Sequence, residues 1–312
     1  MDSSHPVEDL YPSRVGGQAA LKDRLDPVVW GKGSRPFTKK QLEQFDAKGF
    51  LFLPSLFSRA EVDWFLKELE CLKDAETLRE HPAIIREPGS GVIRSVFNAH
   101  RLSQMYSALT RDRRLADRSA QLLGGPVYIH QSRVNLKPAY SGKEFYWHSD
   151  FETWHVEDGM PHMRAVSCSI ALTDNTEFNG PLMVLPGSHK RYVSCAGHTP
   201  DEHYKQSLRR QEYGVPEPEV LDQLSREGGL TAPKGKAGSA LFFDCNLMHG
   251  SNSNITPFPR SNIFLVYNSV ENALVEPFGG IKPRPEFVAS REFTVVEPEE
   301  PSYPLLLKGN LQ

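Results

Sequence analysis

Cysteine is scarce in this sequence. The four cysteines among 312 residues, Cys71, Cys168, Cys195 and Cys245, show neither the spacing of a zinc finger nor that of a redox Cys-x-x-Cys motif. A chain of this length can bury a core large enough to fold without disulfides. We therefore expect free thiols, as in a reducing compartment, and exclude a cysteine-based metal site or disulfide scaffold.

Long apolar runs and a strong net charge are also missing. No stretch is long enough to cross a bilayer, and residues 1–11 are polar and lack the apolar core of a signal peptide. The net charge of −3 gives no electrostatic reason to expect a nucleic acid or an anionic membrane as a partner. We expect a cytoplasmic protein.

Proline and glycine, by contrast, are plentiful, and their 24 and 23 copies are spread along the chain. Such spacing is typical of a fold with many turns. Residues 1–36 are polar, and we expect an arm that packs over the core. Helical patterns follow, one opened by Thr38 and one by the capping-box pair Ser58 and Glu61. Two more helices are expected between residues 102 and 123, with a break near 110–112 and Gly124 as the cap of the second.

Short β-like runs dominate after residue 125, although the first of them comes earlier. We expect strands at 50–53, 127–137, 166–172, 182–185, 240–243 and 263–267. Residues 197–238 are polar and predict an insertion with helix near 204–211 and 219–226. The fold class is therefore mainly β with flanking helices, built on a double-stranded β-helix (jelly roll, cupin-like) core. We expect one domain, 1–312, with an N-terminal arm and helical buttress (1–125) and the β-helix core at 126–295.

Two potential metal ligands, His148 and Asp150, lie in the aromatic run 145–155. In an extended strand, residues i and i+2 project from the same face, so the imidazole and the carboxylate would lie side by side. A third ligand is expected from His249, which follows the strand at 240–243 and precedes Gly250. Two histidines and one carboxylate form the facial set that holds non-haem Fe(II) and leaves coordination positions open.

Arg260 follows His249 by eleven residues, near the start of the next expected strand. Oxygenases with this ligand set commonly take two electrons from a 2-oxo acid, whose distal carboxylate needs a buried cation. A guanidinium binds a carboxylate through two hydrogen bonds and keeps its charge. We assign Arg260 this role, with Ser251 or Ser253 as helpers; the alternative is a surface arginine in a salt bridge.

A zinc site formed by His148, His155 and His162 is a second possibility for this region. The seven-residue spacing falls in a strand-and-turn segment and does not place the three imidazoles on one helix face. We therefore favour the set that includes Asp150 and His249.

The run from Phe145 to Ala165, FYWHSDFETWHVEDGMPHMRA, resembles the signature segment of ectoine hydroxylases. These enzymes belong to the phytanoyl-CoA dioxygenase-like group of 2-oxoglutarate-dependent oxygenases. The similarity continues at residues 9–14, 131–138, 179–183, 186–189, 249–251 and 267–272, so that it covers nearly the whole chain. The resemblance implies a double-stranded β-helix and the conversion of ectoine, 2-oxoglutarate and O2 into 5-hydroxyectoine, succinate and CO2. It also implies a role in compatible-solute biosynthesis under stress and a homodimer.

The resemblance further implies roles for individual residues. His148, Asp150 and His249 would hold iron, and Arg260 would bind the distal carboxylate of 2-oxoglutarate. The supporting residues around the co-substrate would be Lys137, Asn135, Ser169 and Ser251. The residues in contact with ectoine would be Gln131, Trp154 and Arg284, with Phe97 and Phe243 as walls of the pocket.

The ectoine contacts agree with the chemistry of that ring, which carries a carboxylate and a delocalised amidinium cation. Arg284 would pair with the carboxylate, the face of Trp154 would hold the cation, and Gln131 would accept a ring N–H. Each residue also has a structural alternative: Trp154 as a core residue, Gln131 as a sheet-surface residue, and Arg284 as a loop arginine between two prolines.

Rival functions remain open from the sequence. One is a hydroxylase of the same superfamily that acts on another small amino-acid-like molecule. Another is a cupin-like protein that binds a ligand without catalysis, and a structural zinc protein is a third. The related halogenases replace the carboxylate ligand by a small residue, so Asp150 favours hydroxylation.

Overall fold

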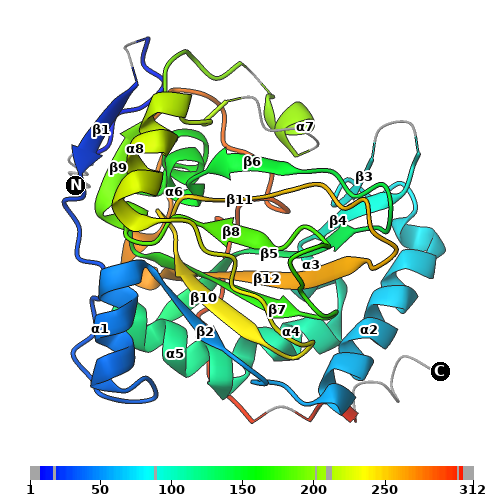
Figure 1. Ribbon diagram of the computed structural model, residues 1–312. Helices are drawn as coiled ribbons and strands as arrows, with labels where there is room; N and C mark the ends of the chain where they lie inside the picture. Colours follow the sequence, from blue (N-terminus) through cyan, green and yellow to red (C-terminus); the bar gives the residue numbers. More distant parts are fainter. Residues whose placement is uncertain are drawn as a thin grey trace, which may run out of the picture.

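A helical layer and two facing β-sheets make up most of the molecule, as the computed structural model shows (Figure 1). The structure describes residues 8–16, 19–87, 90–200, 202–208, 213–300 and 302–304. Its helices are α1 (Lys39–Lys48), α2 (Arg59–Asp74), α3 (Ala99–Leu102), α4 (Gln104–Arg111), α5 (Arg113–Leu123), α6 (Asp150–Thr153), α7 (Tyr204–Ser207) and α8 (Pro218–Gly228). Its strands are β1 (Ala20–Asp23), β2 (Phe50–Leu53), β3 (Ile84–Arg86), β4 (Ile93–Phe97), β5 (Val127–Lys137), β6 (Phe145–His148), β7 (Ala165–Ala171), β8 (Leu182–Val184), β9 (Arg191–Ser194), β10 (Ala240–Asp244), β11 (His249–Ser251) and β12 (Arg260–Ser269).

Local capping signals determine where the N-terminal helices begin and end. Thr38 and Ser58 each form the capping box expected from the sequence, at the start of α1 and α2. Asp112 separates α4 from α5 and accepts a hydrogen bond from the Arg114 backbone amide, so the predicted break lies where it was expected. Gly124 ends α5 with a φ of 74°, a left-handed conformation that favours glycine.

The main sheet has seven strands in the order β2-β10-β7-β12-β5-β4-β3. All five strands expected after residue 125 are present, and β12 is longer than predicted at both ends. Three strands from the expected helical buttress, β2, β3 and β4, also join this sheet. An irregularity in the pairing of β5 with β12 falls at Val266/Tyr267, opposite residues 129–131 of β5. Such an irregularity re-aims the side chains that follow it.

Each face of the main sheet packs against a different layer. Buried residues such as Val134, Ile170 and Leu265 pack with Phe65 and Leu115 of helices α2 and α5. These helices, with α1 and α4, run below the sheet in Figure 1. The other face packs against the small sheet β6-β11-β8 through a second cluster, which comprises Phe50, Val184, Leu241, Phe243, Leu247 and Phe264. Two antiparallel sheets packed in this way are the jelly roll predicted from the sequence.

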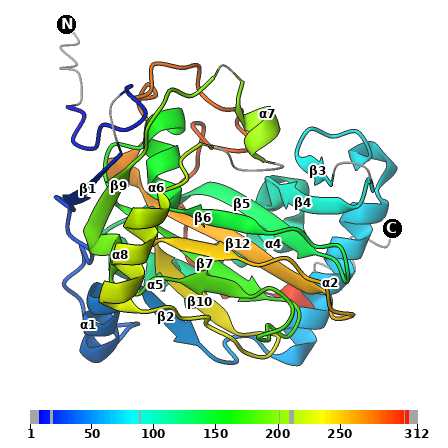
Figure 2. The same cartoon turned by 45° about the horizontal axis from the view of Figure 1, so that its top comes forward.

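The N-terminal arm lies across the core, as expected. Strand β1 of the arm pairs with β9 in an antiparallel ladder from Ala20↔Ser194 to Asp23↔Arg191. In the polar insertion, α8 agrees with the predicted helix near 219–226. The other predicted helix, near 204–211, corresponds to the short α7, and its residues 209–211 lie outside the described residues. Figure 2 shows the arm, α6 and α7 gathered at one end of the sandwich.

The cysteines are all free, as predicted; Cys71 is exposed and the other three are buried. Among the described residues, no helix combines the length and the apolar character that a membrane span requires.

Candidate active site

The two histidines of the predicted metal site face each other across the small sheet. His148 is the last residue of β6 and His249 is the first residue of β11, and the two are register partners in the antiparallel ladder. Asp150 Oδ1 lies 3.6 Å from His148 Nε2 and 3.9 Å from His249 Nε2. The three ligand atoms lie within 4.8 Å of one another, close enough to share one metal ion.

Asp150 reaches this position in a different way from the one predicted. It does not continue the strand of His148 but begins the short helix α6. Ser149 between them is extended, and its hydroxyl accepts the backbone N–H of Glu152 as the helix N-cap. The expectation that both ligands project from one strand face was therefore wrong, since a strand-to-helix turn brings them together.

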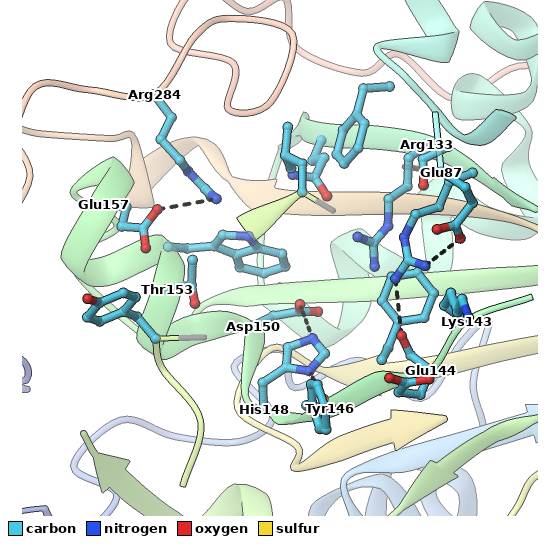
Figure 3. Close-up of a pocket in the computed structure, with 18 residues that line it drawn as sticks. Glu87, Arg133, Lys143, Glu144, Tyr146, His148, Asp150, Thr153, Glu157 and Arg284 are labelled. Atoms are coloured by element: carbon cyan, nitrogen blue, oxygen red, sulfur yellow. Dashed lines mark hydrogen bonds and ion pairs between the residues drawn. The ribbon is translucent and has the colours of Figure 1, made fainter. Parts of the chain in front are cut away.

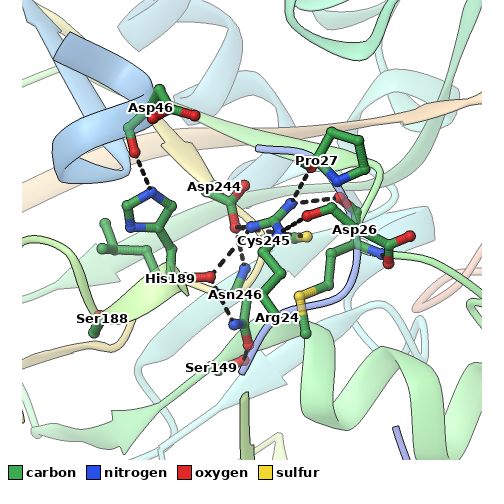
Figure 4. Close-up of polar contacts among 12 residues, drawn as sticks. Arg24, Asp26, Pro27, Asp46, Ser149, Ser188, His189, Asp244, Cys245 and Asn246 are labelled. Atoms are coloured by element: carbon green, nitrogen blue, oxygen red, sulfur yellow. Dashed lines mark hydrogen bonds and ion pairs between the residues drawn. The ribbon is translucent and has the colours of Figure 1, made fainter. Parts of the chain in front are cut away.

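The loop before His249 supports this turn from the side (Figure 4). Ser149 Oγ donates to Asn246 Oδ1 at 2.9 Å, and Asn246 Nδ2 donates to the carbonyls of His189 and Arg191. Arg24 of the N-terminal arm reaches the same loop, and its Nη1 lies 2.8 Å from Asp244 Oδ1. Both ligand-bearing segments are thus tied to one polar cluster.

The protonation of the histidines suits metal binding. His148 Nδ1 and His249 Nδ1 each donate to a backbone carbonyl, at 2.7 Å and 2.9 Å, which directs the lone pair of each Nε2 towards Asp150. Burial, with the nearby His148, lowers the pKa of His249 to about 4, so its imidazole is neutral at physiological pH. Burial opposes ionisation of Asp150, but His249 and His148 hold its pKa below the ordinary value. Two imidazoles and one carboxylate fit a divalent iron ion.

A cavity of about 450 Å³ opens beside His148 and Asp150 (Figure 3). It is mixed in character, and its walls include aromatic, cationic and acidic side chains. Of the residues predicted to contact ligands, six line it: His148, Asp150, Gln131, Trp154, Phe97 and Arg284. Their segments are far apart in sequence, from β4 to the loop after β12.

Two of the predicted substrate contacts are firmly fixed by the surrounding structure. The Gln131 side-chain amide donates to the Val288 carbonyl at 2.7 Å, which leaves its oxygen available as an acceptor. Trp154 begins a π-helical turn, Trp154–Asp158, and its ring lies 5.0 Å from that of His130. π-Helical turns are rare in proteins, and those that occur are often found at functional sites.

Phe243, the second predicted wall, lies behind the metal site instead. Its ring is 5.1 Å from that of His249, and it does not appear among the described residues that line the cavity.

Arg284 is a buried arginine with carboxylate partners. Its Nε and Nη2 donate to the two carboxylate oxygens of Asp158 at 2.7 Å and 2.6 Å. Its Nη1 lies 3.6 Å from Glu157 Oε2, which is too long for a hydrogen bond. Asp158 thus fixes the guanidinium at the cavity wall, and no described residue accepts a hydrogen bond from Nη1.

Two of the residues predicted to bind the co-substrate, Lys137 and Arg260, lie on the paired ends of β5 and β12. Arg260 and Lys137 are register partners, and Lys137 Nζ donates to Ser251 Oγ at 2.8 Å and to the Asn252 carbonyl. Arg260 donates to the Gly180 carbonyl at 2.7 Å and has no carboxylate partner among the described residues. Burial and Arg133 lower the pKa of Arg260 to about 10, while burial and Arg260 lower that of Lys137 to about 6.

Asn135 and Ser169 have other partners. Asn135 accepts a hydrogen bond from Ser95 at 2.8 Å, and Ser169 accepts one from the Asn262 side chain at 3.0 Å. Ser169 also lines a separate small cavity with Asn262 and Leu241.

Arg133 was missed by the sequence analysis. It lines the cavity between Phe97 and Phe264, and its charge acts on Asp150. Alternate residues of a strand share a face, and Gln131, Asn135 and Lys137 of β5 had been predicted as site residues. Residue 133 therefore belongs to the same face.

The alternative zinc set is excluded by the positions of its members. His155 lies against the Met160 carbonyl and Asp9, whereas His162 lies against Asp26. Neither imidazole joins His148.

Comparison with known proteins agrees with this geometry. The family model for phytanoyl-CoA dioxygenase (PhyH) matches residues 45–262. The ectoine dioxygenase of Bordetella parapertussis is 54% identical over 297 residues, which cover 94% of this chain and 96% of the relative. The ectoine dioxygenase of Streptomyces coelicolor is 50% identical over 293 residues, which cover 93% and 98%.

Comparison with solved structures agrees with these sequence matches. The crystal structure of EctD from S. alaskensis with 2-oxoglutarate and 5-hydroxyectoine has a TM-score of 0.85 and 48% identity, and the match covers 94% of this chain and 98% of that one. A structure of EctD with bound Fe has a TM-score of 0.84, 47% identity and the same coverage. With a family model matched over more than half of its length and relatives at about 50% identity, this chain belongs to the phytanoyl-CoA dioxygenase family and, within it, to the ectoine dioxygenases.

Proposed function

We propose that this protein hydroxylates ectoine to 5-hydroxyectoine, with Fe(II) as cofactor and with 2-oxoglutarate and O2 as co-substrates that leave as succinate and CO2. The observation that carries this proposal is the His148–Asp150–His249 ligand set beside a cavity of about 450 Å³, in a chain about half identical to ectoine dioxygenases. One oxygen atom of O2 enters the product and the other enters succinate, so the reaction balances without a further reductant.

The metal would be held by Nε2 of the two histidines and by the Asp150 carboxylate. When bound, Fe(II) activates O2 with electrons from the 2-oxo acid. The protein contributes orientation and the exclusion of water, and no side chain needs to act as a nucleophile or a general base.

The co-substrate is proposed to extend from the metal towards Arg260. Arg260 and Lys137 place two buried cations on paired strands, with Arg133 nearby. Burial lowers the pKa of Lys137 and of Arg260, and repulsion from Arg260 and from Arg133, respectively, adds to the effect. A dicarboxylate would relieve this repulsion, with its distal carboxylate on Arg260 and with Lys137 and Ser251 as supporting donors. We propose Asn135 and Ser169 as more distant supports, because both are engaged with neighbouring side chains.

Binding of 2-oxoglutarate is expected to take up a proton at Lys137. The pKa of Lys137 in the free protein is about 6, against an ordinary value of 10.5, and a nearby carboxylate favours the charged ammonium. Between these two pH values binding therefore adds a proton, and the apparent affinity for 2-oxoglutarate falls as the pH rises. Anaerobic calorimetry in two buffers with different ionisation enthalpies measures this uptake. The Lys137→Met variant should lose it; binding without proton uptake in the unaltered protein would contradict the assignment.

Ectoine is proposed to bind in the cavity between the metal and the π-helical turn. Arg284 Nη1 would donate to its carboxylate, the Trp154 face would hold the amidinium ring, and Gln131 would accept an N–H. Phe97 would close the pocket on the side of β4.

Succinate release separates this function from its rivals. Purified protein with Fe(II), 2-oxoglutarate and O2 should release succinate in proportion to added ectoine and yield a product of one added oxygen. A hydroxylase for another substrate would show this coupling with a different cyclic or linear amino acid, and a binding protein would release no succinate with any of them.

Assembly and location are predictions from the sequence and from the resemblance. We propose a homodimer in the cytoplasm that serves compatible-solute biosynthesis under stress. Light scattering during size-exclusion chromatography tests the dimer, which would elute at twice the chain mass of 35.1 kDa.

A further inference from the structure

A buried cluster of five charged side chains lies behind the cavity wall. Arg14 Nη2 contacts Glu152 Oε2 at 2.5 Å, and Arg14 Nη1 contacts Glu157 Oε1 at 2.6 Å. Arg284 contacts Asp158 on the other side of Glu157. All five side chains are at most 6% exposed. Both arginines come from outside residues 45–262, the region that the family model matches.

One oxygen atom of this cluster has no hydrogen-bond partner in the part of the chain that the structure describes. Glu157 Oε1 is bound by Arg14, whereas no described residue donates to the buried Glu157 Oε2, which lies 3.6 Å from Arg284 Nη1. A buried carboxylate oxygen without a donor is costly, and such groups in native proteins commonly mark a ligand position. Glu157 and Arg284 both line the cavity, and Figure 3 shows them side by side at its wall.

The charges of the cluster favour a cationic group at this point. Three carboxylates, Glu152, Glu157 and Asp158, lie against two guanidinium groups, Arg14 and Arg284, which leaves one negative charge among these five side chains. Such a charge in a buried site interacts strongly with a nearby cation because little water screens it. The cavity wall therefore offers an acceptor with negative charge and, next to it, a donor with positive charge.

We propose that Glu157 is a specificity-determining residue that accepts the N–H of the substrate's amidinium ring through Oε2. In ectoine the carboxylate is attached to the ring carbon next to an amidinium N–H, so the two groups lie side by side. Glu157 Oε2 and Arg284 Nη1 present the complementary pair at 3.6 Å. This inference rests on the proposed function and adds the anionic half of the substrate site.

Arg14 acts as a positioning residue in this arrangement. It holds Glu157 Oε1 from the N-terminal arm, so that Oε2 is left on the side of Arg284 Nη1. It also anchors the arm, because its Nε and Nη2 bind Glu152. The arm thereby contributes to substrate recognition as well as to packing.

The Glu157→Gln variant tests the proposal, since it keeps the size of the side chain and removes its charge. We expect the KM for ectoine to rise by about tenfold or more, since a charge-assisted hydrogen bond in a buried site is lost. The KM for 2-oxoglutarate should change by less than about twofold. A second test uses an ectoine analogue that is methylated at the ring nitrogen next to the carboxylate-bearing carbon. The unaltered protein should bind this analogue as weakly as Glu157→Gln binds ectoine. The Glu157→Gln variant should bind the analogue no more weakly than the unaltered protein does.

Glu152→Gln is the matched control, because Glu152 shares Arg14 but does not line the cavity. It removes one charge of the cluster but no acceptor at the cavity wall, so it should lower the melting temperature at least as much as Glu157→Gln and raise the KM for ectoine much less. Arg14→Lys should restore part of the ectoine affinity that Arg14→Met loses.

An unchanged KM for ectoine in Glu157→Gln, or an equal rise in the KM for ectoine and the KM for 2-oxoglutarate, would overturn the proposal. If the unaltered protein makes no hydroxyectoine, the proposed function itself fails.

Discussion

The Asp150→Ala variant should lose turnover by more than about a thousandfold, because a metal that contributes several kcal/mol to the reaction is no longer held in place. Asp150 Oδ1 is within 3.9 Å of both histidine nitrogens and supplies the anionic ligand of the set. Its loss leaves two imidazoles and no anionic ligand, a set that binds Fe(II) weakly. Anaerobic iron analysis and single-turnover succinate formation should decline together.

Asp174→Ala is a suitable control for this variant. Asp174 is a carboxylate paired with Lys236 on the surface, away from the metal ligands. It should keep both iron content and turnover. Full activity of Asp150→Ala with ordinary iron loading would refute the assignment of the metal site.

The Arg260→Gln variant should raise the KM for 2-oxoglutarate by roughly 30-fold to a few thousandfold. Truncation of one partner of a buried charged pair costs about 2–5 kcal/mol, and each 1.4 kcal/mol is a factor of ten. Arg260 is 3% exposed, and among the described residues its guanidinium donates to the Gly180 carbonyl and to no carboxylate, so the co-substrate would provide its main anionic partner. Steady-state kinetics with each substrate varied in turn measure the effect.

A co-substrate analogue tests the contact between Arg260 and the distal carboxylate separately. A 2-oxo acid without the distal carboxylate should be used equally poorly by the variant and by the unaltered protein. Iron content and the KM for ectoine should stay close to those of the unaltered protein. Equal increases in the KM for both substrates would indicate general damage to the site instead of a lost carboxylate contact.

Much of the fold was predictable because its signals are local. The capping boxes at Thr38 and Ser58, the break at Asp112 and the glycine after α5 each depend on a few adjacent residues, and each was confirmed. The ligands His148 and His249 were also found from the sequence. Their pairing across β6 and β11 required the fold.

The errors arose where conformation depends on tertiary contacts. The His148–Asp150 pair was assigned to one strand, but Ser149 starts a helix there and is held by Asn246 from a loop about a hundred residues later. Arg284 does lie in a loop between two prolines, but its bond to Asp158, which spans 126 residues of sequence, was not predicted. No local sequence pattern predicts such a long-range contact.

Arg133 was a different kind of omission. The face of β5 that carries Gln131, Asn135 and Lys137 includes residue 133 by simple alternation, so the position was available from the sequence. What the sequence could not give is its surroundings, namely Phe97 on β4 and Phe264 on β12.

Isotope labelling with ¹⁸O2 tests the central claim most directly. The protein is incubated with Fe(II), 2-oxoglutarate and ectoine under ¹⁸O2, and the products are measured by mass spectrometry. We expect one ¹⁸O atom in 5-hydroxyectoine and one in succinate, with both compounds formed in equal amounts. Hydroxyectoine without ¹⁸O, or ectoine recovered unchanged from iron-loaded protein, would contradict it.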